Sequence, residues 1–322
     1  MSANIRRDLQ KEFGEEVYTG LTAPQKYLSS AYFYDETGDM LFQKIMELPE
    51  YSPTGCEYEI LDTHKNEIAA LFSDPDGFDL FELGAGDAMK TKILLRQFIN
   101  LGLNFIYHPI DISEHALEEL SENLKEELPQ LQISPLQGTY FGVLNQLGDF
   151  RNRKKVILFL GSNIGNLSPD TAVSLLQKLR AGMEKKDLLF IGMDLKKDPA
   201  IILKAYNDPQ GVTSAFNKNI LSRINRELGG NFNVDNYKHW ALYNPQSGEA
   251  RSYLISLKEQ EVEIKALDLR LKFRRWESIH TEISRKFDEA GIAEMAEDSG
   301  LKLGGSFCDD RDYFRNYVFQ KA

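Results

Sequence analysis

The stretch from Phe78 to Phe98, FDLFELGAGDAMKTKILLRQF, constrains the fold of this chain more than any other segment. Leu80, Phe81 and Leu83 are the apolar residues of a short buried strand, and Gly84 and Gly86 follow where the backbone must turn sharply. The second half predicts a helix that packs back on the strand through Ile93, Leu94, Leu95 and Phe98. A strand, a glycine turn and a helix in this order are typical of α/β sheets that hold an adenosine-bearing cofactor.

The residues after the two glycines narrow the choice of cofactor. A dinucleotide site needs a third glycine, so that the helix can approach a pyrophosphate, and Met89 occupies that position here. The next apolar strand, NFIYHPID, ends at Asp111, about 25 residues beyond the turn, where an acid suits two ribose hydroxyls. Glu-x-Gly-x-Gly followed by such an acid resembles the arrangement in class I S-adenosylmethionine (SAM) methyltransferases.

Composition argues against several other classes of protein. A net charge of −11 without a run of Lys or Arg does not suit a nucleic-acid backbone. Cys56 and Cys308 are the two cysteines and lie far apart in the sequence, so we expect neither a disulfide framework nor a cysteine metal site. The charged N-terminus lacks an apolar signal core, and no apolar run is long enough to span a membrane. We expect a cytoplasmic monomer that binds no metal, nucleic acid or membrane.

The order of patterns along the chain predicts an α/β fold with an insertion. Five apolar runs between residues 56 and 196, separated by helical patterns, predict a parallel sheet; they read LFEL, NFIYHPID, LQISPLQG, VILFLG and LLFIGMD. Residues 200–228 predict helix broken at Pro209 and Gly211, and the alternation from residue 238 predicts an antiparallel insertion. A helix ending at Gly300 and two strands then return to the first sheet. Before all of this, Pro49 and Pro53 are expected to terminate a helix of an N-terminal cap.

Several long motifs in one order resemble a single family. They are YFYDETGDMLFQKIMELPEYSPT, FELGAGDAMKTKILL, FLGSNIGNLSP, MDLKKD, AYNDPQGVTSAFNKNILSRINREL and ESIHTEISRKF. Together they are similar to the histidine-specific, SAM-dependent Nα-methyltransferases of ergothioneine biosynthesis. The resemblance runs from about residue 18 to the C-terminus.

The resemblance implies a fold, a reaction and a domain division. A class I Rossmann-like methyltransferase domain would comprise residues 56–196 and 287–322, and a second α+β substrate-binding domain residues 1–55 and 197–286. The implied reaction is three successive methylations of the α-amino group of L-histidine by SAM, which give hercynine and S-adenosylhomocysteine.

Carried over by motif, the resemblance also implies the cofactor-binding residues. They are Tyr34, Gly84, Lys90, Asp111, Thr139 and Tyr140. Lys90 can meet the methionine carboxylate of SAM. The segment Gly138-Thr139-Tyr140 stands where the family has Gly-Asp-Phe, so the Thr139 hydroxyl replaces a carboxylate near the adenine amine.

The implied substrate-binding residues are Tyr51, Gly161, Asn166, Tyr206, Glu282 and Ser284. Asn166 follows a buried strand, and its amide can accept from an amine or donate to a carboxylate; its alternative role is to cap the next helix, for which Ser168 is better suited. Glu282 and Ser284 lie two apart on a predicted strand and so share one face, where together they can address an imidazole ring.

Two departures from the family bear on the side-chain pocket. Ser252 stands where well-known members of the family have a larger apolar residue, and Asn163 replaces a smaller hydroxyl residue. Two alternatives therefore stay open beside histidine methylation. One is an α-amine methyltransferase for another amino acid, and the other is a non-catalytic SAM-sensing module.

Overall fold

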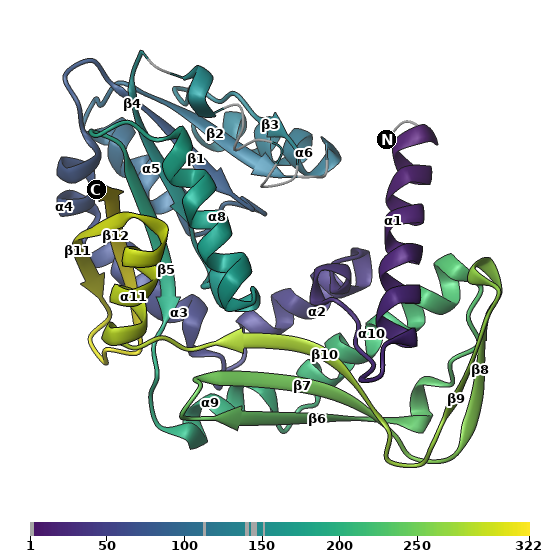
Figure 1. The fold of residues 1–322 in the computed structure, drawn as a ribbon. Coiled ribbons are helices and arrows are strands. Elements are labelled where there is room, and N and C mark those ends of the chain that lie inside the picture. The colour runs from purple at the N-terminus through teal and green to yellow at the C-terminus, as the bar shows by residue number, and fades with distance from the viewer. Residues whose placement is uncertain (1–2, 112–113, 139–141, 143–146, 151) are drawn as a thin grey trace. The chain divides into compact units, whose positions relative to one another are not determined.

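The computed structural model describes every residue except 1–2, 112–113, 139–141, 143–146 and 151 (Figure 1). The chain divides into two compact units, each assembled from segments that are distant in the sequence. Unit 1 contains Met1–Ser52 and Lys196–Arg285, and unit 2 contains Pro53–Leu195 and Lys286–Ala322. Which ligand each unit binds stays a prediction.

Unit 2 is built on one sheet, whose described strands follow the order β11-β12-β5-β4-β1-β2-β3 (Figure 1). The pairs among β1 to β5 are parallel, whereas β12 runs antiparallel to β5 and β11 antiparallel to β12. The predicted α/β fold, with a mostly parallel sheet closed by a reversed hairpin, is thus confirmed. The strands are β1 (Phe78–Leu83), β2 (Phe105–Asp111), β3 (Leu136–Gln137), β4 (Lys154–Phe159), β5 (Leu188–Asp194), β11 (Leu301–Cys308) and β12 (Phe314–Lys321).

Helices cover both faces of this sheet. Ile157 and Phe159 of β4 pack with helices α8 and α11, while the alternate residues Val156 and Leu158 pack with α4, α5 and α6. Burial on both faces explains why the parallel strands are almost continuously apolar. The helices of unit 2 are α3 (Ser52–Thr63), α4 (Lys65–Phe72), α5 (Thr91–Asn100), α6 (Glu114–Glu127), α8 (Pro169–Gly182) and α11 (Glu289–Ser299), with 3₁₀ turns η2 (Leu147–Asp149) and η3 (Asn163–Asn166).

Two details of the sequence prediction are wrong. The run LQISPLQG forms only the two-residue strand β3, preceded by a single bridge between Tyr107 and Ile133, because Pro135 has no N–H to continue the ladder. Pro53 does not terminate a helix. It is the second residue of α3, where a missing N–H costs no helical hydrogen bond.

Unit 1 combines helices with two small antiparallel sheets, as the alternation from residue 238 predicted. The first sheet has the order β10-β7-β6, and the second pairs β8 with β9. Its strands are β6 (Tyr237–Asn244), β7 (Glu249–Ser256), β8 (Gln260–Ile264), β9 (Leu269–Phe273) and β10 (Ser278–Arg285). Its helices are α1 (Ala3–Thr22), α2 (Glu36–Met46), α9 (Pro199–Tyr206) and α10 (Val212–Leu228), with the 3₁₀ turns η1 (Ser30–Phe33), η4 (Val234–Asn236) and η5 (Lys265–Leu267).

One apolar core holds unit 1 together. Phe33, Phe216 and Ile220 pack with Tyr237 and Leu254 of the sheet, and each is almost fully buried. Residues 199–228 are helical with the predicted break: Gly211 has φ +74°, and α9 ends before it at Tyr206. The N-terminal segment joins the same unit because Leu28 N donates to His280 O of β10 at 2.8 Å.

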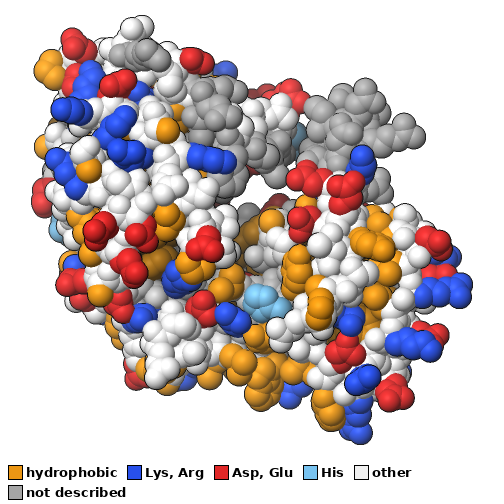
Figure 2. Space-filling model, viewed as in Figure 1, with side chains coloured by type: hydrophobic (Ala, Val, Ile, Leu, Met, Phe, Trp, Pro, Cys, Tyr) orange, Lys and Arg blue, Asp and Glu red, His pale blue; other side chains and the backbone are white. Residues whose placement is uncertain are grey.

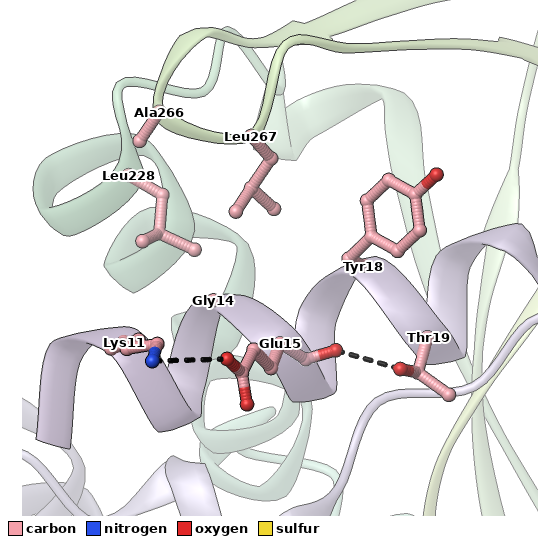
Figure 3. A pocket seen from close by; sticks show the side chains of 8 residues that line it. All are labelled: Lys11, Gly14, Glu15, Tyr18, Thr19, Leu228, Ala266 and Leu267. Atoms are coloured by element: carbon pink, nitrogen blue, oxygen red, sulfur yellow. Dashed lines mark hydrogen bonds and ion pairs between the residues drawn. The ribbon is translucent and has the colours of Figure 1, made fainter. Parts of the chain in front are cut away.

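The surfaces in view carry acidic and basic side chains interspersed (Figure 2). A groove of about 470 Å³ lies in unit 1 between α1, the end of α10 and η5 (Figure 3). None of the residues predicted to bind cofactor or substrate lines it. In the described part of the chain, no helix combines the length and apolarity needed to cross a bilayer.

Candidate cofactor and substrate sites

The glycine turn after β1 has the backbone geometry that the sequence predicted. Gly84 and Gly86 have φ of +70° and +53°, in the left-handed region that favours glycine. Gly84 N donates to Ile110 O at 3.0 Å, and β1 and β2 are parallel with Leu83 beside Ile110. The turn and Asp111 therefore leave the sheet side by side at its carboxyl edge, where open α/β sheets bind ligands.

The side chain of Glu82 forms hydrogen bonds to the helix and the strand next to this turn. Its buried carboxylate accepts a hydrogen bond from Thr91 Oγ1 of α5 at 2.5 Å and another from the Tyr107 hydroxyl of β2. Burial raises the pKa of Glu82 to about 7, although both hydrogen bonds act to lower it. The acid of the Glu-x-Gly-x-Gly motif thus ties β1 to the next helix and the next strand.

Lys90 lies at the N-cap position of α5 and pairs with the carboxylate of Glu57 on α3. A lysine ammonium carries three N–H groups. The contact with Glu57 is the one polar contact of the Lys90 ammonium among the described residues, which leaves donors for an anionic group of a ligand. The positive-φ glycines, Asp111 and Lys90 together fit the ribose and carboxylate of SAM.

The loop after β4 holds two of the predicted substrate-binding residues. Gly161 has φ +76°, and its N–H donates to Glu57 Oε2 at 2.8 Å. Asn166 ends η3 and is half-buried, and Ser168 caps α8 by accepting from Thr171 N at 3.2 Å. Because Ser168 caps the helix, that structural task does not require the Asn166 amide.

Thr139 and Tyr140 lie outside the described residues, so their predicted contacts stay predictions.

In unit 1, Glu282 lies beside a β-bulge in β10. The register against β7 shifts between His280 and Glu282, and Ser252 of β7 lies opposite Glu282. A bulge leaves two residues facing one on the partner strand, so consecutive side chains can reach the same neighbour. Thr281 and Glu282 do so, because both hydrogen-bond to Asn217 of α10.

The carboxylate of Glu282 belongs to a side-chain network. Ser252 Oγ donates to Glu282 Oε2 at 3.1 Å, and Asn217 Nδ2 donates to the same oxygen at 3.3 Å. Asn217 is itself held, because Thr281 Oγ1 donates to its Oδ1 at 2.7 Å and its Nδ2 also donates to Thr213 O. Asn217 and Ser252 are fully buried. The network holds the carboxylate in one orientation.

The other predicted residues of unit 1 gather around the same sheet. Ser284 is buried and faces Ala250, two pairs along the strands from Glu282 and Ser252. Tyr206, at the end of α9, packs on Ala250, and Tyr51 packs against the same apolar cluster. Tyr34 is 43% exposed, and its ring contacts Phe42 and Phe216 edge-on. Unit 1 therefore brings Tyr51, Tyr206, Glu282 and Ser284 to one region, and Tyr34 adjoins its aromatic core.

Two residues of these sites were missed by sequence reasoning. Asn217 and Glu57 are both fully buried, and each lies in the apolar stripe of its helix. A polar residue within such a stripe is the signal that could have found them, because a buried polar group requires partners. No metal site involves the histidines of the described residues, because these residues contain no group of three His, Cys, Asp or Glu side chains able to hold a metal.

A sequence profile of the family described as histidine-specific, SAM-dependent methyltransferase matches residues 13–321. The chain belongs to this family. It is therefore an enzyme that uses SAM, which confirms the resemblance and sets aside the non-catalytic sensing module. Membership also agrees with the α/β sheet and its glycine turn, and with the predicted class I Rossmann-like fold.

Relatives of known function cover most of the chain. A histidine N-alpha-methyltransferase of Mycolicibacterium smegmatis is 37% identical over 289 residues, which is 89% of this chain and 88% of that protein. One of Mycobacterium tuberculosis is 35% identical over 286 residues, with the same coverage. Ergothioneine biosynthesis protein 1 of Schizosaccharomyces pombe is 29% identical over 301 residues, which is 91% of this chain but 39% of that longer protein.

Proposed function

We propose that this enzyme transfers three methyl groups from SAM to the α-amino group of free L-histidine, forming hercynine as the first step of ergothioneine biosynthesis. The observation that carries the proposal is the Glu282 carboxylate, which Ser252 and Asn217 hold beside the buried Ser284. Family membership and the names of the bacterial and yeast relatives support it. We further propose that the enzyme acts as a cytoplasmic monomer without a metal, nucleic-acid or membrane partner.

On the substrate side, Glu282 and Ser284 are proposed to recognise the imidazole. A carboxylate accepts from one ring nitrogen while a hydroxyl addresses the other, which fixes the tautomer. An apolar substrate side chain would not supply the ring N–H that the Glu282 carboxylate is proposed to accept, and a site built to hydrogen-bond its substrate rejects such analogues strongly. Tyr206 offers a phenolic donor to the substrate carboxylate, and Tyr51 offers an aromatic wall.

On the cofactor side, Gly84, Lys90 and Asp111 are proposed to hold SAM, with Tyr34, Thr139 and Tyr140 as further contacts. When bound, SAM supplies a methyl group that is already activated by its sulfonium. The protein then mainly has to bind, orient and exclude water. Asn166 and Gly161 are proposed to orient the α-amine, which must be uncharged to present a lone pair and must release a proton after each transfer.

The decisive experiment is mass spectrometry of histidine incubated with SAM and the protein. The proposal expects three successive additions of a methyl group and a fragment pattern that places all of them on the α-amine. Methylation on the imidazole ring, or an end point short of three methyl groups with SAM in excess, would contradict it.

The second candidate is α-amine methylation of another amino acid. Ser252 favours it, because its small, hydrogen-bonding side chain stands where the resemblance implies a larger apolar residue, and a changed pocket can change the preferred side chain. Competition among the twenty amino acids separates the candidates. The histidine proposal expects histidine to have the highest kcat/KM, and a higher value for any other amino acid would favour the alternative.

A further inference from the structure

Glu57 of α3 is a fully buried carboxylate for which the proposed mechanism has no use. It lies in unit 2 among three hydrogen-bond donors. Lys90 Nζ and the Gly161 N–H both address Oε2, the latter at 2.8 Å, and Asn316 Nδ2 of β12 donates to Oε1 at 2.9 Å. Burying a charged group is costly unless it is paired and hydrogen-bonded, and Glu57 has both kinds of partner.

The sheet makes room for this carboxylate. Gly192 of β5 pairs with Asn316, and a Cβ atom at position 192 would lie only 2.0 Å from Glu57 Oε1. No side chain other than that of glycine leaves the carboxylate in place. The residues that share the buried face of α3 with Glu57 are apolar, as Cys56, Ile60 and Leu61 show. Glu57 is thus a charged residue on the otherwise apolar buried face of α3, and it lies where Gly192 of β5 leaves space for its carboxylate.

The partners of Glu57 show what the carboxylate positions. Lys90 belongs to the segment after β1, and Gly161 belongs to the loop after β4. One carboxylate oxygen therefore joins the two loops at the ligand-binding edge of the sheet. Lys90 is a flexible side chain that is 18% exposed, and one N–H held by Glu57 directs the other two.

We infer that Glu57 is a positioning residue of the cofactor site, which aims the Lys90 ammonium at the carboxylate of SAM and anchors the Gly161 loop beside it. The inference rests on the proposed contact between Lys90 and that carboxylate. It does not depend on which amino acid is methylated.

The test compares two ligands, of which only one contains the carboxylate that Lys90 is proposed to bind. S-adenosylhomocysteine carries the amino-acid carboxylate, and 5′-methylthioadenosine lacks it. Dissociation constants are measured by titration calorimetry for the full-length wild type and for Lys90→Met, Glu57→Leu, Glu57→Gln and Glu57→Asp. Binding of 5′-methylthioadenosine also reports that each variant is folded.

Glu57→Leu removes every acceptor at similar volume, and we expect it to weaken S-adenosylhomocysteine binding about tenfold while 5′-methylthioadenosine binding stays unchanged. Glu57→Gln should restore most of the affinity. Its side-chain carbonyl can still accept from Lys90 and Gly161, and the Asn316 amide can rotate so that its oxygen accepts from the new side-chain N–H. Glu57→Asp keeps the charge but is shorter, and a several-fold loss is expected, so the test does not depend on Glu57→Leu folding.

The matched control is Lys92→Met. Lys92 lies two residues after Lys90, in the first turn of α5, is equally exposed at 18%, and pairs with Glu127 at 2.7 Å instead of Glu57. Its loss should leave both dissociation constants unchanged. Unchanged S-adenosylhomocysteine binding in Glu57→Leu and Glu57→Asp, with a loss in Lys90→Met, would overturn the Glu57 inference alone. Equal loss of both ligands would overturn it too, by showing a merely structural role. Unchanged binding in Lys90→Met would overturn both the Lys90 contact and the inference.

Discussion

The candidate sites of the two units differ in whether backbone geometry or side chains define them. In unit 2, the ligand-binding edge of the sheet depends on backbone geometry, since Gly84, Gly86 and Gly161 all have positive φ. In unit 1, the candidate substrate site depends on side chains from three elements, because Asn217, Ser252 and Glu282 meet from α10, β7 and β10. A turn defined by its backbone suits a cofactor that many enzymes share, whereas discrimination among amino acids requires side chains.

The largest expected effect breaks the side-chain site. Glu282→Ala removes the acceptor that Ser252 and Asn217 hold, so kcat/KM for histidine should fall by about a thousandfold, because discrimination is proposed to depend on a hydrogen bond from the imidazole to this carboxylate. S-adenosylhomocysteine affinity should not change. Glu261→Ala is the control, because Glu261 is an exposed glutamate of β8 that pairs with Lys272 at 3.0 Å, and activity should survive its loss. Full histidine selectivity in Glu282→Ala would refute the role of this network.

The next prediction concerns the side chain that supports the backbone-built turn. Burial raises the pKa of Glu82 from 4.5 to about 7, so the folded protein keeps this proton at pH values where the unfolded chain has released it. The free energy of unfolding should therefore decrease as the pH rises from 4.5 to 7, by about 3 kcal/mol from this group. Urea unfolding of the wild type and of Glu82→Gln at pH 5 and pH 8 checks this. The variant should lack this decrease, and equal pH dependence in both proteins would rule it out.

A substitution in the turn itself separates backbone geometry from stability. Gly86→Ala meets no neighbouring atom, but its φ of +53° is costly for alanine, and we expect SAM affinity to fall about tenfold. Gly211→Ala is the matched control: Gly211 also has positive φ, +74°, and open space, but it lies in unit 1 before α10. It should lose similar stability and no SAM affinity. If both variants bind SAM equally well, the turn does not shape the cofactor site.

The smallest expected effect tests the departure at position 252. Ser252→Ala removes one donor to Glu282 while Asn217 remains, so KM for histidine should rise about fivefold with little change in kcat. Ser256→Ala provides the control on the same strand, because Ser256 is equally buried but donates to Lys258 O. Steady-state kinetics should show no change in KM for the control. An equal rise in both variants would indicate loosening of β7 in place of a specific contact.

The cofactor side could be predicted further from the sequence than the substrate side. The turn from Leu83 to Gly86, the helix after it and Asp111 are specified by neighbours close in the chain, and their geometry follows from strand and glycine patterns. The Glu282 network could not be predicted in this way. Asn217 and Ser252 lie 65 and 30 positions from Glu282, and a β-bulge decides that Thr281 and Glu282 both reach Asn217.

The one error in strand prediction has a local cause. LQISPLQG carries the apolar content of a strand, but a single missing N–H at Pro135 limits its pairing. Glu57 shows the opposite case, because a charge within an apolar helix stripe appears unfavourable until the opening over Gly192 and the donors around it are known.

The most direct test of the account is a crystal structure of the enzyme with S-adenosylhomocysteine and L-histidine bound. We expect one imidazole nitrogen to donate to the Glu282 carboxylate, with Ser284 at hydrogen-bond distance from the ring, while Lys90 binds the carboxylate of the nucleotide and Asp111 its ribose. Histidine bound with its imidazole away from Glu282 and Ser284 would contradict the account.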